Sequence, residues 1–206
     1  RIIYGSDHGD CQGARGIFGK FTMYEESAAV PLVLCGPGVP EGRVVHTPVS
    51  LIDGFPTVLD AVGASPSPED SDLPGESLLA IATEPDRERT AFSEYHALGS
   101  RNAIYMLRSL RHKYIYHVGG PPALFDLEAD PDETRDISSL PESEPILTKF
   151  EARLRAILDP EATDGQAKAD QEARIEAFGG EAEVRKRGAF TNSPVPGVTP
   201  LFKRFS

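Results

Sequence analysis

Four short runs of β-type sequence between residues 90 and 127 constrain the fold of this chain more than any other feature. They are TAFSEYH (90–96), AIYMLRSL (103–110), HKYIYHV (112–118) and ALFDL (123–127), separated by Gly, Pro or charged turns. Runs rich in aromatic and β-branched residues with short connections are typical of antiparallel strands. The sequence therefore predicts a small four-stranded antiparallel sheet.

An amphipathic helix is predicted directly after this sheet, in EPILTKFEARLRAIL (144–158). Its apolar residues recur at helical spacing and form one face, made of Ile146, Phe150, Leu154, Ile157 and Leu158. Such a stripe is buried against another element, and the sheet offers the nearest apolar surface. We expect the helix and sheet to form one subdomain over residues 86–160.

The preceding residues, 1–85, are organised differently. Residues 1–5 form a short strand expected to be buried, followed by a Gly- and Asp-rich loop and a short helix within 22–28. A second strand at 30–35 ends at a Gly-Pro-Gly turn, and a helix is expected within 50–62. This order is typical of an α/β sheet with a site at the strand ends, so we expect these two strands to be parallel. Cys35, at the end of an apolar run, is expected to be buried.

The last segment, 161–206, is predicted to hold a polar, Ala-rich helix over about 165–178 and then a Pro-rich tail. Exposure to water of Leu201, Phe202 and Phe205 in the tail would be costly. We therefore expect the tail to dock on another surface, which favours a homo-oligomer.

Composition excludes several classes of partner. The net charge is −11, whereas nucleic-acid binding needs a concentrated basic face. The dense basic cluster Arg185-Lys186-Arg187 follows an acidic stretch and is typical of a helix C-terminus. No apolar run approaches the ~20 residues of a membrane span. The two cysteines cannot form a disulfide framework.

The residues Ser6-Asp7-His8-Gly9 follow the first predicted strand, where an α/β sheet usually carries its chemistry. A carboxylate and an imidazole side by side can bind one divalent cation, and Gly9 allows a sharp turn behind them. Two ligands form only part of an oxygen-rich metal site. The alternative is a loop cap beside a solvated histidine, and on spacing alone that alternative is the commoner one.

The surrounding residues resemble the sulfatase family of the alkaline phosphatase superfamily. The matching motifs occur in the family's order: Ser6–Gly9, Lys20, Tyr24–Ser27, Val30–Leu32, Gly36–Gly38 and Val-Ser-x-x-Asp-x-x-Pro-Thr at 49–57. HKYIYHVGGPPALFDLEADPDETRDI (112–137) is similar to the family's C-terminal strands and Asp-Pro-x-Glu turn. The resemblance covers residues 1 to about 140, and PVPG in the tail more weakly resembles choline-sulfatase-like and phosphonate-monoester-hydrolase-like members. It implies an α/β, alkaline-phosphatase-like fold of which this chain is the C-terminal part.

The resemblance implies roles for individual residues. Asp7 and His8 match a pair of metal ligands, where histidine instead of the commoner asparagine permits Ca²⁺ and favours Mn²⁺. Lys20 matches the lysine that contacts the sulfate and leaving-group oxygens, where a cation stabilises developing charge. His96, at a strand end, is a candidate to hydrogen-bond the ester or protonate the leaving group. Arg15 is a candidate anion contact.

The family's nucleophile is absent from this chain. Sulfatases use a formylglycine made from Cys or Ser in a Cys/Ser-x-Pro-x-Arg motif. Cys11 lacks the proline at the required offset, and Cys35 lacks the arginine. We therefore expect the formylglycine and the other metal ligands on an N-terminal portion of the same enzyme, and no turnover by this chain alone.

Three functions stay open from the sequence. The first is hydrolysis of a small-molecule sulfate ester. The second is hydrolysis of a phosphonate monoester or phosphodiester, which uses the same motifs. The third is a non-catalytic sulfatase-like module that binds an anion or a partner. The missing nucleophile favours the third, whereas the presence of Asp7, His8 and Lys20 favours an enzyme.

Overall fold

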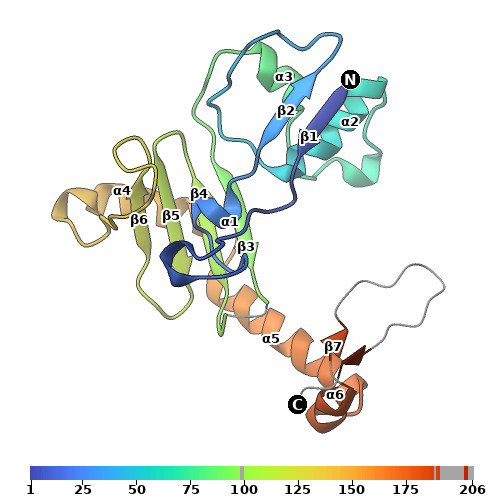
Figure 1. Ribbon diagram of the computed structural model, residues 1–206, viewed down its shortest axis with the longest axis vertical. Coiled ribbons are helices and arrows are strands. Elements are labelled where there is room, and N and C mark those ends of the chain that lie inside the picture. Colours follow the sequence, from blue (N-terminus) through green and yellow to red (C-terminus); the bar gives the residue numbers. More distant parts are fainter. Residues whose placement is uncertain (98–99, 188, 191–201, 204–206) are drawn as a thin grey trace. The chain divides into compact units, whose positions relative to one another are not determined.

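The computed structural model describes residues 1–97, 100–187, 189–190 and 202–203 (Figure 1). The chain divides into two compact units, residues 1–160 and 161–206. The boundary that we predict near residue 85, inside the first unit, stays a prediction.

The four predicted β runs form a four-stranded sheet, which confirms the sequence prediction. Its strand order is β3-β4-β5-β6, and each neighbouring pair is antiparallel. The strands are β3 (Ala91–Tyr95), β4 (Ile104–Arg108), β5 (His112–His117) and β6 (Ala123–Asp126). Neighbours in the sheet are also neighbours in the sequence, so each strand pairs with the next one along the chain.

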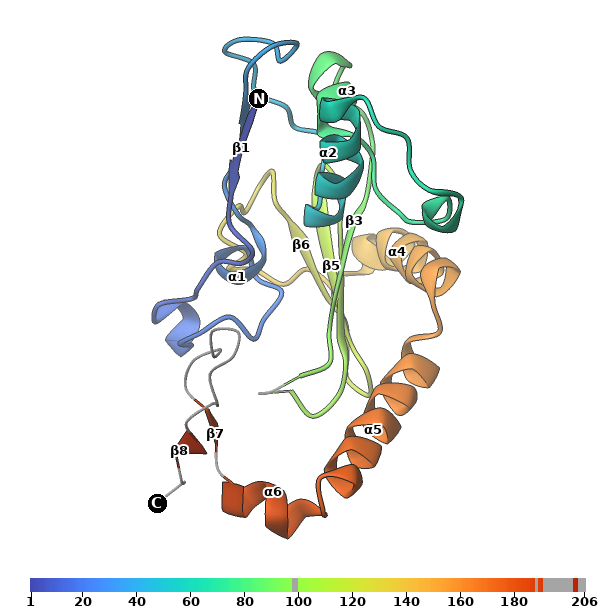
Figure 2. The ribbon, with the colours of Figure 1, turned by 90° about the vertical axis from the view of Figure 1, so that its right-hand side faces the viewer.

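Successive side chains of a strand point to opposite sides, so the sheet has two faces of side chains. Both faces are covered by other elements. Figure 2 shows α4 (Glu144–Ile157) against one face and α1 (Glu25–Ala28) with its preceding loop against the other. The buried residues on the α4 side are Ala103, Tyr105, Leu107, Tyr114, Leu124, Phe150 and Leu154. Those on the α1 side are Met23, Ile104, Met106, Ile115 and Phe125. The predicted packing of the helix on the sheet is thus confirmed.

The first two strands form a separate antiparallel pair, and the prediction of parallel strands is wrong. β1 (Ile2–Gly5) pairs with β2 (Leu32–Cys35). Parallel neighbours need a long crossover, usually a helix. Here the connection holds only short helical turns, and the chain returns in the opposite direction.

Two predictions about burial in this pair are also wrong. All four residues of β1 are exposed. In β2, Leu32 and Leu34 are half-buried, whereas Val33 and Cys35 lie on the exposed side. Strand alternation therefore places Cys35 outward, and Cys11 is the buried cysteine instead.

The predicted helix after β2 is present as the 3₁₀ turn η2 (Leu51–Asp53) and α2 (Gly54–Val62), followed by α3 (Leu78–Thr83). Its apolar residues lie largely exposed, as do those of β1. We define the exposed apolar surface by Ile2, Ile3, Tyr4, Val33, Leu51, Ile52, Phe55, Val58 and Val62. Apolar residues at helical spacing identify a face of a helix, but not what covers it.

Asp53 holds this region together. Its side chain is fully buried, with both carboxylate oxygens accepting hydrogen bonds from Arg89 at 2.8 and 2.5 Å. The main-chain amides of Ser50 and Glu76 donate to the same carboxylate. The hydroxyl of buried Thr57 donates to the Asp53 carbonyl and accepts from the Leu78 amide. The Val-Ser-x-x-Asp-x-x-Pro-Thr motif thus joins α2 to α3 and to the strand that follows.

The second unit contains α5 (Pro160–Ala177), α6 (Glu181–Arg187) and the pair β7 (Ala189–Phe190) and β8 (Phe202–Lys203). The predicted polar helix is α5, and the basic cluster ends α6 as predicted. Leu201 and Phe205 lie outside the described residues, and the docking of the tail stays a prediction. The remaining 3₁₀ turns are η1 (Ala14–Gly16), η3 (Pro68–Asp70) and η4 (Pro141–Ser143). In the part of the chain that is described, no helix has the length and apolarity to cross a bilayer.

Replacing Leu124 with alanine tests the packing of the sheet. Leu124 is fully buried on the α4 side. The truncation should lower the free energy of unfolding by about 2–5 kcal/mol, because it removes apolar contacts and leaves a cavity. Urea unfolding followed by circular dichroism measures the change. The control is Leu110→Ala in the exposed β4–β5 turn, with an expected change within about 0.5 kcal/mol. Equal midpoints for the two variants would contradict this account of the core.

Asp53→Asn tests the buried carboxylate. An asparagine has one acceptor oxygen in place of two and no charge, so half-buried Arg89 keeps only Glu76, 3.9 Å away, as a counterion. We expect a loss of about 3–5 kcal/mol in the free energy of unfolding. Asp72→Asn, at an exposed position, is the matched control and should change stability by less than about 0.5 kcal/mol.

Candidate functional site

The predicted metal ligands lie directly after β1, at the start of a loop that we call the site loop, residues 6–22. Asp7 Oδ2 and His8 Nε2 are 3.5 Å apart, and both side chains reach solvent. The Ser6 hydroxyl donates to the His8 carbonyl at 2.8 Å, and the His8 amide donates to Asp7 Oδ1 at 3.1 Å. These local hydrogen bonds fix the two side chains next to each other.

The hydrogen bonds of His8 indicate its tautomer. Nδ1 lies 2.8 Å from the Gly9 carbonyl, which can only accept, so the ring proton is on Nδ1. Nε2 then carries the lone pair, and the ammonium of Lys20 contacts that atom as a donor. A neutral imidazole with its lone pair on the outward nitrogen is the form that binds a metal.

Asp7 is held in its charged form. Hydrogen bonding to its own main-chain amide is the largest cause that lowers the pKa of this carboxyl, and hydrogen bonding to the His8 amide lowers it as well. The more distant charge of Lys20 acts in the same direction. The carboxylate is therefore ionised throughout the neutral range, as a metal ligand must be.

Asp7 and His8 fit part of a divalent-metal site. A carboxylate oxygen and an imidazole nitrogen 3.5 Å apart are close enough to share one cation, given ligand distances of roughly 2.1–2.5 Å. Within the described residues, no cluster of three or more His, Cys, Asp or Glu side chains could hold a metal alone.

Main-chain hydrogen bonds give the site loop its compact shape. The Cys11 amide donates to the Gly19 carbonyl at 2.8 Å, and the Gly13 amide donates to the Ile17 carbonyl at 2.9 Å. These two bonds bring Lys20 back beside His8. The side chain of Cys11 is buried under the loop.

Arg15, the candidate anion contact, points toward the turn after β6. Its guanidinium donates to the carbonyls of Asp132 and Glu133 and lies 4.1 Å from the ring centre of Tyr24. It also pairs with Glu26 at 3.3 Å. Contact between Arg15 and a substrate anion stays a prediction.

His96 follows β3, and its ring lies against Tyr105 on the α4 side of the sheet. The ring of Phe21, next to Lys20, lies 6.3 Å from the ring of Tyr95 between centres. His96 Nε2 is 3.2 Å from Glu94, and its ring meets Tyr105 edge-on. The structure thus brings Tyr95 to the site loop, whereas His96 faces the α4 side, and the chemical role of His96 stays a prediction.

Comparison with known proteins decides the family. Residues 13–159 match the model of the C-terminal region of N-sulphoglucosamine sulphohydrolase. The chain belongs to the sulfatase family.

Two curated relatives and one solved structure illustrate the similarity. The chain is 39% identical over 168 residues to arylsulfatase K of Danio rerio, covering 77% of this chain and 31% of the relative. It is 34% identical over 192 residues to choline-sulfatase of Rhizobium meliloti (strain 1021), covering 92% of this chain and 36% of the relative. Phosphonate monoester hydrolase of Agrobacterium radiobacter superimposes with a TM-score of 0.63 at 29% identity, covering 75% of this chain and 34% of that one. The chain therefore spans about a third of the length of these relatives.

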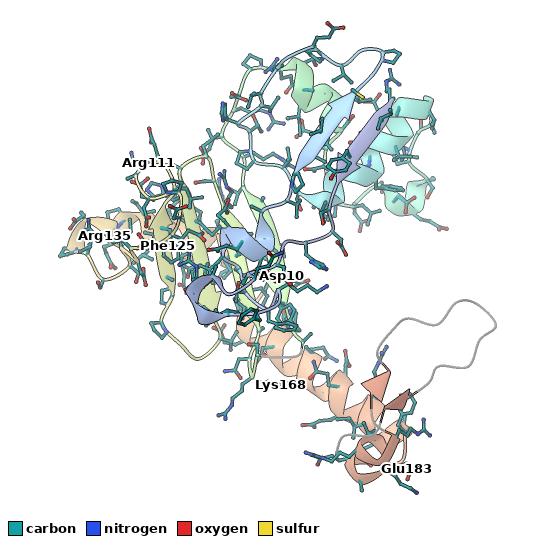
Figure 3. All side chains as sticks on the ribbon, in the orientation of Figure 1. Asp10, Arg111, Phe125, Arg135, Lys168 and Glu183 are labelled. Carbon is teal, nitrogen blue, oxygen red and sulfur yellow. The ribbon has the colours of Figure 1, made fainter. Side chains whose placement is uncertain are left out.

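Sequence reasoning missed two residues behind the site loop: Glu133 contacts Arg15 of the loop, and Lys113 contacts Met23 directly after it. Lys113 on β5 and Glu133 after β6 have fully buried side chains that form an ion pair at 2.7 Å. The sequence holds a weak signal for Lys113, which shares one side of its strand with the apolar Ile115. Figure 3 shows Asp10 of the site loop well apart from Arg111, which lies in the β4–β5 turn.

Gly9→Ala tests how the site loop is seated. A Cβ at Gly9 would lie 2.1 Å from the Glu26 carbonyl oxygen, so the loop must move away from α1. We expect a loss of about 1–3 kcal/mol in the free energy of unfolding, measured by urea titration. Gly54→Ala is the matched control: this helical glycine has open space around its Cβ and should gain up to about 1 kcal/mol.

Proposed function

We propose that this chain is the C-terminal part of a hydrolase of small-molecule sulfate esters. The observation that carries the proposal is the convergence of Asp7, His8 and Lys20 at one solvent-facing point in a member of the sulfatase family. The three side chains offer an anionic oxygen, a nitrogen with a lone pair and a cation, and His8 contacts each of the other two. That set suits a divalent cation and a sulfate group together.

In the proposed site, Asp7 and His8 are two ligands of a divalent cation, Ca²⁺ or Mn²⁺. A carboxylate suits both ions, and the imidazole favours Mn²⁺ over Ca²⁺. When bound, the cation supplies polarisation of the ester oxygens and activation of the nucleophile. The Nδ1 bond of His8 to Gly9 keeps Nε2 directed at the cation.

Lys20 has the second role in the proposed site. Its ammonium contacts His8 Nε2 here, so it lies within side-chain reach of an ester bound next to the cation. There it donates hydrogen bonds to the sulfate and the leaving-group oxygen as negative charge develops. His96 is the proposed donor of a proton to the departing oxygen, and its Nε2 lies 3.2 Å from Glu94.

The N-terminal portion of the same enzyme is the proposed partner of this chain. It supplies the formylglycine nucleophile and the remaining metal ligands. The exposed apolar surface on β1, β2 and α2 supports this partner, since several of its side chains are more than half exposed. Apolar area of this extent is typical of a surface that another part of the protein covers. We expect the chain alone to bind metal weakly and to turn over no ester.

A phosphonate monoester hydrolase is the second candidate function. The superposition on the Agrobacterium radiobacter enzyme supports it. Phosphonate and sulfate esters both present anionic oxygens on a tetrahedral centre, so the same cation and lysine can bind either. A comparison of aryl sulfate with aryl phosphonate turnover by the intact enzyme separates the two candidates.

Substitutions at the proposed site should impair the intact enzyme in different ways. Lys20→Met should lower kcat for an aryl sulfate by about 10²–10³, because it removes a donor to the developing charge. His8→Ala should raise the Kd for Mn²⁺ by more than about tenfold, because it removes a direct ligand. The measurements are chromogenic turnover and calorimetric metal titration.

The matched control is Lys149→Met on the exposed surface of α4, which should change neither quantity. Wild-type kcat in Lys20→Met would contradict the role of this lysine. Tight stoichiometric binding of Mn²⁺ by residues 1–206 alone would contradict the division of the metal site between two portions of the enzyme.

A further inference from the structure

A buried ionic cluster joins the site loop to the sheet on the side of α1. Its centre is the ion pair between Lys113 on β5 and Glu133 in the turn after β6, both with fully buried side chains. The Lys113 ammonium also pairs with Glu25, the first residue of α1, and donates to the Met23 carbonyl at 3.0 Å. Arg15 joins the cluster from the site loop, with its guanidinium 3.8 Å from the Glu133 carboxylate.

Glu133 binds the chain on both sides of Lys20. Its carboxylate accepts a hydrogen bond from the Glu25 amide at 2.8 Å, and its main-chain carbonyl accepts one from Arg15 at 2.8 Å. Lys20 lies midway between these two residues in the sequence. Glu133 itself has a φ of 50°, a left-handed conformation that a non-glycine residue keeps only where its surroundings enforce it.

The contacts of α1 connect Glu133 to the proposed metal ligands as well. The Gly9 amide donates to the Ser27 carbonyl of α1 at 2.9 Å, directly after His8. A helix of one turn is not stable by itself, so its position depends on the groups that bind its ends. Glu133 and Lys113 bind the first turn of α1, and α1 in turn seats Gly9.

Buried ion pairs add little net stability compared with apolar side chains of similar volume. Their directional bonds do, however, select one arrangement of the groups they join. A cluster at this position is thus suited to fixing a location, and the location it fixes is that of the site loop.

We propose that Arg15, Lys113 and Glu133 are positioning residues that set the place of Lys20 and of the Asp7-His8 pair. This inference rests on the proposed function, because it assigns the site loop to catalysis. It gives Arg15 a different role from direct contact with a substrate anion. A positioning role predicts a loss in kcat, whereas an anion contact made equally in ground state and transition state predicts a rise in KM.

Arg15→Gln in the intact enzyme is the first test. Glutamine is too short to reach the Asp132 and Glu133 carbonyls, so the loop before Lys20 loses its anchor. With p-nitrophenyl sulfate and saturating Mn²⁺, kcat per folded molecule should fall about 10- to 100-fold, since small misplacements of catalytic groups have effects of this size. KM should stay within about threefold of the wild-type value. Arg111→Gln removes an exposed arginine that pairs with Asp126 at the remote end of the sheet, and both constants should stay unchanged.

Lys113→Met combined with Glu133→Gln is the second test. Removing both charges avoids leaving one of this pair buried alone, and both replacements keep the side-chain volume nearly constant. The expected result is again a lower kcat with little change in KM. A rise in KM at constant kcat in Arg15→Gln would overturn the proposal, as would wild-type kcat in both variants.

Hydrogen exchange separates failure of this proposal from failure of the proposed function. If the wild-type enzyme hydrolyses no sulfate ester, the proposed function is wrong. Amide hydrogen exchange alone then tests whether the ionic cluster positions the site loop. Faster exchange at the Cys11 and Gly13 amides in Arg15→Gln, with unchanged exchange in β4 and β5, would support positioning of the loop. Equal exchange at Cys11 and Gly13 would overturn it.

Discussion

The β3–β6 sheet is the constraint on which the rest of the first unit depends, because both of its faces are covered. The α4 side is closed by the apolar face of an amphipathic helix, with the Tyr114 hydroxyl donating to Glu151 of that helix at 3.0 Å. The α1 side is closed by a loop and one helical turn, which bring main-chain groups close to the sheet. Buried main-chain groups must form hydrogen bonds, so this side carries the charged pair Lys113 and Glu133 among apolar neighbours.

The sequence predicts the sheet and α4 well, because each is specified by its own periodicity. Alternation within residues 90–127 and helical spacing within 144–158 each describe an element and the face that it buries. The same reasoning was wrong for β1, β2 and Cys35. A two-strand pattern does not state whether the strands run parallel, which depends on the path of the connection. Nor does an apolar run indicate whether the surface that would bury it belongs to the same chain.

The candidate site also contains some residues that the sequence identifies and others that it does not. Adjacent residues such as Asp7 and His8 can be recognised as a donor pair from the sequence, and the resemblance to sulfatases adds Lys20. Lys113 and Glu133 could not be found in this way, because a lysine in a strand and a glutamate in a turn usually face solvent. Their burial follows from a contact between segments about a hundred residues apart, such as the Glu133 carboxylate with the Glu25 amide.

That contact explains how so short a helix can hold a site in place. The amides at the start of a helix have no partner within the helix and are usually capped by the preceding residue. α1 has no side-chain cap from Tyr24, the residue before it, and the carboxylate of Glu133 takes that place from a distant turn. The negative charge of Glu133 then meets the positive end of the helix and the ammonium of Lys113 together. A local cap would stabilise α1 equally well but would leave it free to move against the sheet, whereas a remote cap fixes its position as well as its fold.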